Sequence, residues 1–323
     1  LKAHVHVVVV GFSYVERKKK YLFENGQRKE VSHINAYLIE APDTFIYSRS
    51  KSLCDVPKIG IGNKPIDGGN YLFEKEEMEE FIKREPKSAA LFHPWYGSVE
   101  FIHQKPRYCL WLGDCSPKEI KEMPLCYERV ENVRNVRLAS TSAGTRKLAD
   151  TPTRFHVENM PDGDSIIVPS VSSEKRKYVP MGFIPKGTFA SNLVLLIPSA
   201  TLYHFGILES NVHMAWMRAV CGRLKSDYRY SKDVVYNNFP WPSPTAGQKE
   251  KIEQSAQAIL DARALYPDSS LADLYDPTLM PKELLQAHRQ NDRAVMAAYG
   301  FSTKMTESEC VAELFKRYAE MVE

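Results

Sequence analysis

Residues 215–242, AWMRAVCGRLKSDYRYSKDVVYNNFPWP, combine basic and tyrosine side chains with an apolar face that carries a tryptophan. Ser210 is a good N-cap residue, and a helical period from there places several apolar side chains on one arc. They are Val212, Trp216, Ala219, Val220 and Leu224. Three basic residues fall on the opposite side if the helix continues that far: Arg218, Lys225 and Arg229. The pattern predicts a helix over residues 211–225 with one buried and one cationic face.

A cationic helix face of this kind has two interpretations. It can hold the phosphate backbone of a nucleic acid, because lysine and arginine neutralise phosphates. It can equally be the solvated face of an ordinary core helix. The rest of the chain is needed to choose between them.

The composition is that of a globular protein. The chain has 323 residues, 43% hydrophobic and 26% charged, which is enough for two domains with buried cores. The longest apolar run near the start, residues 5–10, is too short to span a bilayer, and no signal peptide precedes it. Six scattered cysteines form no CxxC pair and have no histidine at ligand spacing, which argues against disulfides and zinc. We therefore expect a cytoplasmic protein with reduced thiols and no membrane partner.

Charge is distributed unevenly along the chain. Residues 246–323 contain 9 Lys and Arg against 13 Asp and Glu, a net charge of −4. Because the whole chain has a net charge of +3, residues 1–245 have a net charge of +7. A basic body predicts a polyanionic partner. The acidic end predicts a structural or protein-facing role.

The order of the expected elements predicts a mixed α/β fold followed by a small all-helical region. Residue 1 is not methionine and residues 4–10 read as a strand without a preceding turn, so we expect a longer parent polypeptide. A charged, flexible segment is expected at residues 16–20. Further strands are predicted over residues 44–48, 107–112, 165–171 and 193–197, and helices over residues 75–83 and 211–225. After the Pro-rich residues 237–247, helices are predicted over residues 248–265, 281–299 and 306–322, the last with a Thr306–Glu309 capping box.

The sequence contains no recognisable catalytic motif. Gly60-Ile61-Gly62 leads into a turn instead of a helix, which argues against a nucleotide cradle. Asn237-Asn238-Phe239-Pro240 superficially resembles the Asn-Pro-Pro-aromatic motif that holds a flipped base, but a proline is misplaced and a basic helix precedes it. We expect no catalytic residue, metal site or cofactor site in this chain.

Several loops combine bases with hydrogen-bonding side chains. The segment VSSEKRKYVP follows a predicted buried strand, and arginine, glutamate and serine can all contact base edges in a major groove. The alternative is a solvated loop at a strand end. A second group of bases can contact phosphates or only solvate loops: Arg129, Arg134, Arg137, Arg146, Lys147 and Arg154.

Several sequence segments of this chain resemble segments of a known protein family and occur in the same order. They are SRSKSLCDVPKIGIGNKPIDGG, FHPWYGSVEFI, RYCLWL, SIIVPSVSSEKRKYVPMGF, ASN, FGILESNVHMAWMRAVCGRLKSDYRYS, VYNNFPWP and AHRQNDRAVMAAYGF. The chain resembles the C-terminal half of the MmeI-like DNA methyltransferases, adenine-modifying enzymes of restriction-modification and phage-defence systems. In that family the catalytic domain, with its S-adenosylmethionine loop and Asn-Pro-Pro-aromatic motif, lies upstream, and residues 3–12 resemble only its last strand.

The resemblance implies three parts of the chain. Residues 1–20 would be a remnant of the last methyltransferase strand and a linker, residues 21–245 the DNA target recognition domain, and residues 246–323 a helical C-terminal domain. The implied function is sequence-specific binding of double-stranded DNA as part of an S-adenosylmethionine-dependent adenine methyltransferase. This chain alone is expected to bind no cofactor and to have no catalytic activity. Its second expected partner is the methyltransferase domain of its own parent chain.

The expected site residues fall into three groups. Contacts with the DNA backbone are assigned to Arg218, Arg223, Lys225, Arg229 and Tyr230. Base-reading candidates are Ser172, Ser173, Glu174, Lys175 and Arg176. The mouth of a DNA cleft is assigned to Arg49, Lys51, Asn63 and Lys64.

Three alternatives remain open from the sequence. The basic loops also suit a module that binds structured RNA in an RNA-modifying enzyme. The chain could instead be an interaction domain that docks a catalytic partner. A self-contained enzyme would require a deep pocket with paired, pKa-shifted carboxyl groups.

Overall fold

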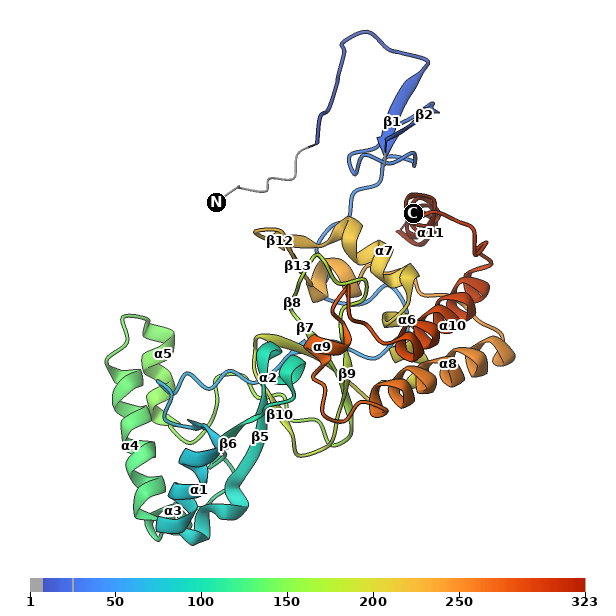
Figure 1. The fold of residues 1–323 in the computed structure, drawn as a ribbon. Coiled ribbons are helices and arrows are strands. Elements are labelled where there is room, and N and C mark those ends of the chain that lie inside the picture. Colours follow the sequence, from blue (N-terminus) through green and yellow to red (C-terminus); the bar gives the residue numbers. More distant parts are fainter. Residues whose placement is uncertain (1–7, 25, 323) are drawn as a thin grey trace, which may run out of the picture.

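The computed structural model describes residues 8–24 and 26–322, and its fold is organised around two hydrophobic cores. Figure 1 shows a smaller unit at the lower left, joined to a larger body from which the N-terminal hairpin projects. We call the smaller unit, residues 64–157 with Phe189 and Ala190, the outlying unit. We call residues 246–322 the helical tail. The mixed α/β fold with a helical C-terminal region is as predicted.

The outlying unit is a four-stranded sheet covered by helices. Its strand order is β10-β5-β6-β4, with β10 parallel to β5 and the other pairs antiparallel. The strands are β4 (Leu72–Phe73), β5 (Phe92–Tyr96), β6 (Arg107–Leu110) and β10 (Phe189–Ala190). The helices are α1 (Lys75–Arg84), η1 (Pro86–Leu91), α2 (Ser98–His103), α3 (Pro117–Lys121), α4 (Pro124–Leu138), α5 (Ala143–Lys147) and η2 (Leu148–Asp150).

The chain enters and leaves the outlying unit at adjacent positions. Lys64 and Val157 form an isolated antiparallel bridge, in which the Lys64 amide donates to the Val157 carbonyl at 2.9 Å. The His156 amide donates back to the Lys64 carbonyl at 2.9 Å. Buried aromatic side chains such as Trp95 and Phe155 then fill a core of the unit's own.

The body is built on a second four-stranded sheet of order β3-β11-β7-β9, with all pairs antiparallel. The strands β7 and β11 are apolar runs of almost fully buried residues, as expected for strands covered on both faces. The strands are β3 (Gly60–Ile61), β7 (Ser165–Pro169), β9 (Gly182–Ile184) and β11 (Val194–Pro198). Two helices pack here, α6 (Leu202–Leu208) and α7 (Asn211–Val220), followed by the single π-helical turn η3 (Lys232–Tyr236).

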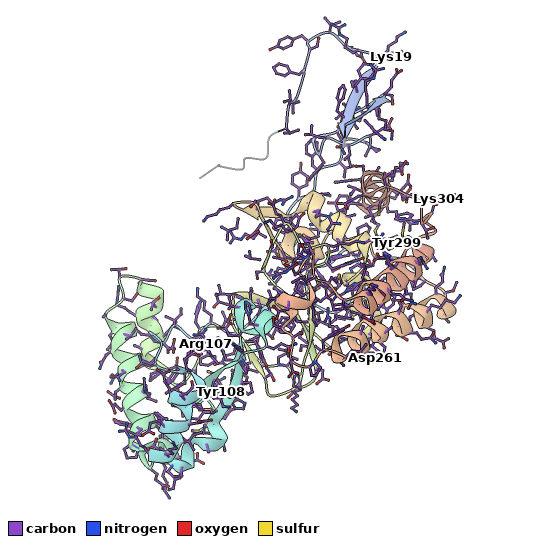
Figure 2. All side chains as sticks on the ribbon, in the orientation of Figure 1. Lys19, Arg107, Tyr108, Asp261, Tyr299 and Lys304 are labelled. Carbon is purple, nitrogen blue, oxygen red and sulfur yellow. The ribbon has the colours of Figure 1, made fainter. Side chains whose placement is uncertain are left out.

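The helical tail shares the core of the body. Its helices are α8 (Ala246–Ala264), α9 (Leu271–Leu274), α10 (Lys282–Tyr299) and α11 (Glu307–Val322). Helix α8 packs on α6 and α10, and α11 packs on α7 (Figure 1). Tyr299, labelled in Figure 2, is buried and donates its hydroxyl proton to the Pro240 carbonyl at 2.8 Å. One continuous core therefore extends across residue 245.

A buried polar network joins the tail to the middle of the chain. Glu209 is fully buried at the end of α6, and Arg263 of α8 donates to its carboxylate at 3.0 Å. Arg263 also donates to the Met181 carbonyl and to the Tyr275 hydroxyl. Burial raises the pKa of Glu209 to about 7, against the opposing effect of Arg263.

Several predicted elements are confirmed within a few residues. The helices predicted over residues 75–83, 248–265 and 281–299 correspond to α1, α8 and α10. The Thr306–Glu309 capping box at the start of α11 is also confirmed, because the Thr306 amide donates to the Glu309 carboxylate at 2.8 Å. The reciprocal bond, from the Glu309 amide to the Thr306 hydroxyl, measures 3.3 Å.

Other predicted elements are wrong. The helix predicted over residues 211–225 ends at Val220, because Cys221 is extended and Gly222 starts a strand. Residues 44–48 form no strand, and residues 8–10 of the strand predicted over 4–10 are not in a strand either. Residues 4–7 lie outside the described part of the chain. An antiparallel hairpin of β1 (Lys20–Glu24) and β2 (Gln27–Val31) follows the segment expected to be flexible.

Candidate nucleic-acid interface

A small three-stranded sheet at the edge of the body brings two segments of interest together. Its order is β12-β13-β8, and all pairs are antiparallel. The strands are β8 (Val171–Ser172), β12 (Gly222–Leu224) and β13 (Asp227–Arg229). In the register, Tyr228 pairs with Ser172. The cationic hairpin and the loop of residues 172–177, called the 172–177 loop below, therefore start from one sheet, although about fifty residues separate them.

Lys225 lies at the tip of the β12–β13 hairpin. The two-residue turn is Lys225-Ser226, and Lys225 is exposed with φ at +58°. Non-glycine residues in this left-handed region pay a steric cost of about 1 to 2 kcal/mol, and glycine or asparagine is the usual choice in such turns. A lysine at this position is therefore unfavourable for the turn itself.

Arg223 and Arg229 are exposed on the two strands of the hairpin. The guanidinium of Arg223 lies over the ring of Tyr228 at 4.1 Å from its centroid and donates to the Ser226 carbonyl at 2.9 Å. Tyr228 is buried under it, so Arg223 is held in place while its remaining donors face solvent. Three cations of the hairpin thus extend from one edge of the body.

Two other expected backbone contacts are engaged inside the protein. Tyr230 is buried, and its hydroxyl is hydrogen-bonded to His213 at 2.9 Å. Arg218 donates to both carboxylate oxygens of Glu307, at 2.7 and 2.9 Å, and to the Lys177 carbonyl at 3.1 Å. Only 19% of the Arg218 side chain is exposed.

The base-reading candidates differ in exposure. Ser172 is buried in β8, Ser173 and Glu174 are partly exposed, and Lys175 is exposed. The Glu174 amide donates to the Asp227 carboxylate at 3.3 Å, which fixes the loop against the hairpin. Arg176 is partly buried, and this burial lowers its pKa, while Asp227 and Asp276 oppose the change.

Arg49 and Lys51 lie on an irregular segment that Asn237 and Asn238 hold. Asn237 Nδ2 donates to the Arg49 carbonyl at 2.7 Å, and the Arg49 amide donates to the Asp233 carbonyl at 2.9 Å. Asn238 Nδ2 donates to the Tyr47 carbonyl at 2.9 Å. The NNFPWP motif therefore holds this segment in place. The sequence identified the motif but not this role, because its partners lie nearly 190 residues away.

Asn63 and Lys64 lie at the neck of the outlying unit. Asn63 is fully buried, donates to the Ala190 carbonyl at 3.1 Å and accepts from the Asn159 amide at 2.7 Å. Lys64 is exposed. The structure does not bring Asn63 to the surface with the hairpin cations.

The second group of bases is divided between structural and exposed positions. Arg137 is fully buried, and the guanidinium of Arg129 lies 4.9 Å from the centroid of the Phe73 ring. Arg154 pairs with Glu158 at 2.5 Å, and Arg146 donates to the Ser140 carbonyl at 2.8 Å. Arg137 is therefore unable to contact phosphates, whereas Arg134, Arg146 and Lys147 are exposed.

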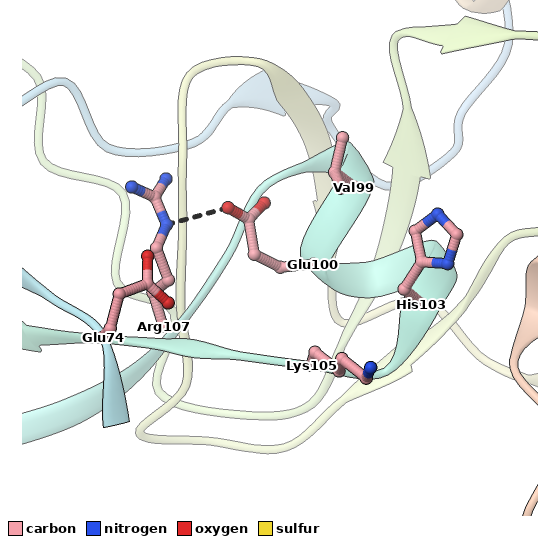
Figure 3. Close-up of a pocket in the computed structure, with 6 residues that line it drawn as sticks. All are labelled: Glu74, Val99, Glu100, His103, Lys105 and Arg107. Carbon is pink, nitrogen blue, oxygen red and sulfur yellow. Dashed lines mark hydrogen bonds and ion pairs between the residues drawn. The ribbon is translucent and has the colours of Figure 1, made fainter. Parts of the chain in front are cut away.

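An open groove of about 590 Å³ lies on the outlying unit, away from the hairpin. Its lining mixes acids and bases: Glu74, Val99, Glu100, His103, Lys105 and Arg107. Figure 3 shows the Glu100 carboxylate turned toward Arg107, and the ion pair measures 2.8 Å. Within the groove, the Glu100 carboxylate is therefore held by a base.

The described residues contain neither a metal site nor a membrane-spanning helix. Within residues 8–24 and 26–322, no cluster of three histidine, cysteine, aspartate or glutamate residues could hold a metal ion. No helix in this same part of the chain is long and apolar enough to cross a membrane. All six cysteines are free thiols.

The comparisons with known proteins agree with one another. A family model described as "MmeI, target recognition domain" matches residues 40–243, and one described as "MmeI, C-terminal domain" matches residues 245–323. DNA methyltransferase A of Bacillus subtilis (strain 168) is 43% identical over 322 residues. That match covers 99% of this chain and 36% of the relative.

A solved structure matches the fold as well as the sequence. It is that of the Type IIL restriction-modification enzyme MmeI in complex with DNA, with a TM-score of 0.89 and 42% sequence identity. The match covers 95% of this chain and 42% of that one. The chain therefore spans well under half the length of both of these relatives.

Proposed function

Because this chain belongs to the MmeI family, whose target recognition and C-terminal domains together match residues 40–323, we propose that it binds double-stranded DNA sequence-specifically. It acts as the target recognition part of a longer S-adenosylmethionine-dependent adenine DNA methyltransferase. The missing part is the catalytic domain, which is its second partner. The length of the two relatives supports this, since the chain covers only 36% and 42% of them.

The observation that carries this proposal is the sheet β12-β13-β8. It places three exposed cations beside a loop rich in groups that can hydrogen-bond to base edges. Cations on a hairpin can follow the phosphates of one strand while the neighbouring loop enters a groove. Such a division of labour is usual, because phosphate contacts position a protein and base contacts specify the sequence.

The backbone strain at Lys225 adds support. Strained residues persist where the surroundings hold them and often mark functional positions. A glycine would satisfy the turn but would carry no charge. We infer that the lysine is retained for its ammonium group at the hairpin tip.

The roles of the expected site residues divide accordingly. Direct phosphate contacts belong to Arg223, Lys225 and Arg229, and we assign further phosphate contacts to Arg49 and Lys51. Base reading belongs to the 172–177 loop, chiefly through its exposed or partly exposed members Ser173, Glu174, Lys175 and Arg176. The remaining expected contacts support the surface from within or at its margin: Arg218, Tyr230, Ser172, Asn63 and Lys64.

Among the described residues, the glycine turn that resembles a nucleotide cradle does not fit S-adenosylmethionine. The glycine turn at residues 60–62 packs against backbone, because a Cβ at Gly62 would lie 2.3 Å from the Ser191 carbonyl oxygen. We therefore assign cofactor binding and methyl transfer to the upstream part of the parent protein. Its action belongs in the cytoplasm, since six free cysteines suit a reducing compartment.

The salt dependence of DNA binding tests the proposal. Affinity for a labelled duplex should fall steeply with salt, and Arg223→Gln, Lys225→Gln and Arg229→Gln combined should reduce the slope of log affinity against log salt by about 2 to 3. Affinity should fall for all duplexes alike, because phosphates carry no sequence information. Fluorescence anisotropy over a salt series measures both quantities.

A matched control removes three exposed lysines from the tail: Lys251, Lys282 and Lys304. Lys304 lies on the side of the molecule away from the hairpin (Figure 2). These Lys→Gln changes alter net charge equally and should leave the slope unchanged. Equal effects of the two triple variants would count against a localised interface. Better competition by structured RNA than by duplex DNA would favour the RNA-binding alternative.

A further inference from the structure

The 172–177 loop lies between two different parts of the molecule. On one side, β8 pairs with β13, and the Glu174 amide donates to Asp227. On the other side, the end of the loop is anchored by α7 and by the helical tail that packs on it: Arg218 donates to the Lys177 carbonyl, and Tyr178 donates to Asp292. The geometry of the loop therefore depends on residues more than 100 positions further along the chain.

Arg218 is the first of these anchors. Its guanidinium holds the Lys177 carbonyl at 3.1 Å while both of its other donor nitrogens engage the Glu307 carboxylate at 2.7 and 2.9 Å. A planar guanidinium in such a two-pronged ion pair has a fixed orientation. The start of α11 thus determines where Arg218 points, and Arg218 determines where the loop ends.

Tyr178, the next residue, is the second anchor. It is fully buried, and its hydroxyl donates to the Asp292 carboxylate of α10 at 2.7 Å. The other oxygen of Asp292 accepts the Asn211 amide at the start of α7 at 2.7 Å. The ring of Tyr178 stacks on His288, with centroids 4.0 Å apart and an angle of 18°. Helix α10 therefore fixes the position of Tyr178.

Charge adds a third link between the tail and the loop. Burial lowers the pKa of Arg176, and two carboxylates oppose that change: Asp227 of the hairpin and Asp276, which follows α9 in the tail. The electrostatic surroundings of Arg176 therefore include the tail as well as the sheet.

We propose that the helical tail sets the sequence specificity of this protein by holding the 172–177 loop in its reading conformation. Arg218 and Asp292 are the positioning residues, and Glu307 orients Arg218. This inference rests on the proposed function, because it assumes that the 172–177 loop reads bases. It assigns the acidic tail a role in recognition without any contact between the tail and DNA.

Glu307→Gln is the decisive variant, because half of the Glu307 side chain is exposed and its loss should leave the core intact. The matched control is Glu313→Gln, which removes an ion pair with Lys316 from the same helix without touching the loop. Arg218→Lys completes the set. It keeps a cation near Glu307 but cannot bind the carboxylate and the Lys177 carbonyl with one planar fork.

The first measurement needs no DNA. Trypsin cleaves after lysine and arginine, and the loop contains Lys175, Arg176 and Lys177 in succession. We expect Glu307→Gln and Arg218→Lys to raise the rate of native-state cleavage in the loop several-fold, and Glu313→Gln to leave it unchanged. Equal rates in all four proteins would overturn the proposed anchoring.

The second measurement uses a pool of duplexes with a randomised central segment. The wild-type chain should enrich one sequence class, and its affinity ratio for enriched over scrambled duplex should fall on the order of tenfold in Glu307→Gln. Affinity for the scrambled duplex, and its salt slope, should stay the same, as should the ratio in Glu313→Gln. A retained ratio in Glu307→Gln would overturn this inference alone. A wild-type chain that enriches no sequence would overturn the proposed function as well.

Discussion

Some arginines of this chain are exposed and suit DNA contacts, whereas others are buried and hold the fold together. Arg137 is of the second kind. Its side chain is fully buried, and its guanidinium donates to five backbone carbonyls at 2.7 to 2.9 Å. The carbonyls belong to Pro65, Ile66, Leu148, Thr151 and Arg154. This one side chain therefore fastens two loops to α4.

Replacing Arg137 should be strongly destabilising. In Arg137→Met five carbonyls lose their donor, and each buried unsatisfied group costs about 1 to 3 kcal/mol before the loops relax. We expect the free energy of unfolding to fall by about 3 kcal/mol or more in urea titrations. The control is Arg134→Met, an exposed position on the same helix, which should change it by no more than about 0.5 kcal/mol. Similar losses in both variants would refute the structural role.

His213 gives a prediction for pH dependence. Burial lowers the pKa of His213 from 6.5 to about 3, while its ring hydrogen-bonds Tyr230. Below pH 6.5 the unfolded chain therefore takes up a proton that the folded chain does not, and stability is lost as the pH falls toward 3. Between pH 6.5 and 5 this one group contributes a loss of about 2 kcal/mol.

The variant His213→Gln should show a correspondingly smaller loss over the same pH interval. Glutamine can still bond to the tyrosine hydroxyl but does not titrate. Urea unfolding of wild type and variant at pH 6.5 and 5 measures the difference. The exposed His156→Gln is the control and should follow the wild type. Coincident pH profiles of wild type and His213→Gln would contradict the assignment.

At the residue level, the sequence predicted which side chains are exposed better than it predicted their hydrogen-bond and ion-pair partners. Arg223, Lys225 and Arg229 are exposed, as charged residues in a loop or hairpin usually are. Arg218 and Tyr230 were expected on the same surface but face Glu307 and His213. Glu307 lies 89 positions from Arg218, and a helical period contains no information about such a distant partner.

At the level of elements, local signals sufficed where they were strong. Helix α8 begins with a capping box, and α10 and α11 have clear apolar stripes; all three were predicted within a few residues. The end of α7 was not, because continuing it would cost about 1 kcal/mol at Gly222, and pairing with β13 offers its backbone another partner. That strand pairing is invisible to helix propensity.

Helix α4 is the clearest omission from the prediction. Its buried side chains recur at helical spacing at residues 126, 130, 133 and 137, but the last of these is an arginine. Val136 and Leu138 are meanwhile about half exposed. The apolar stripe that marks an amphipathic helix is therefore blurred, although the helix is 15 residues long.

The close backbone approach at Gly62, the residue after β3, gives a prediction at this same level. A Cβ at Gly62 would meet the carbonyl oxygens of Ser191 and Ala190 at 2.3 and 2.4 Å, and backbone cannot move aside easily. Gly62→Ala should therefore lower the free energy of unfolding by about 2 to 3 kcal/mol in denaturant titrations. Gly60→Ala is the control, because its Cβ would meet only a side-chain nitrogen of Asn159 at 3.2 Å, and should cost under about 1 kcal/mol. Equal costs would mean that the backbone around residue 62 can accommodate a Cβ.

For the whole molecule, the continuous core predicts that the chain cannot be divided at residue 245. Ending it there would remove several fully buried side chains of the tail and expose the body residues that they cover. These side chains are Ile252, Ile259, Leu284, Val295, Leu314 and Phe315. Each is worth about 1.5 to 3 kcal/mol of burial, against about 5 to 15 kcal/mol for a typical domain. The buried carboxylate of Glu209 would also lose its hydrogen bond and ion pair with Arg263. We expect residues 1–245 alone to lose the fixed tertiary structure of the body, which a weakened near-ultraviolet circular dichroism signal would show.

Adding residues 246–323 as a separate chain should restore that structure. Coexpression of the two pieces, followed by gel filtration, tests whether they assemble. A well-folded, monomeric piece ending at residue 245 would show that the tail is dispensable for the fold. The sequence predicted a helical tail, but the shared core could not be foreseen, since residues that meet in it, such as Tyr37 and Phe315, lie far apart in the sequence.

The paired crossing at Lys64 and Val157 has a consequence for how such proteins can diversify. Because the outlying unit leaves the body within one hydrogen-bonded bridge of where it entered, it behaves as a cassette spliced into a surface loop. Another module whose ends lie equally close could take its place without shifting the register of β3, β7 or β11. That module would have to offer an edge to Phe189 and Ala190, which now pair with β5, and an apolar face like that of α2, whose Phe101 and Ile102 pack in the core of the body.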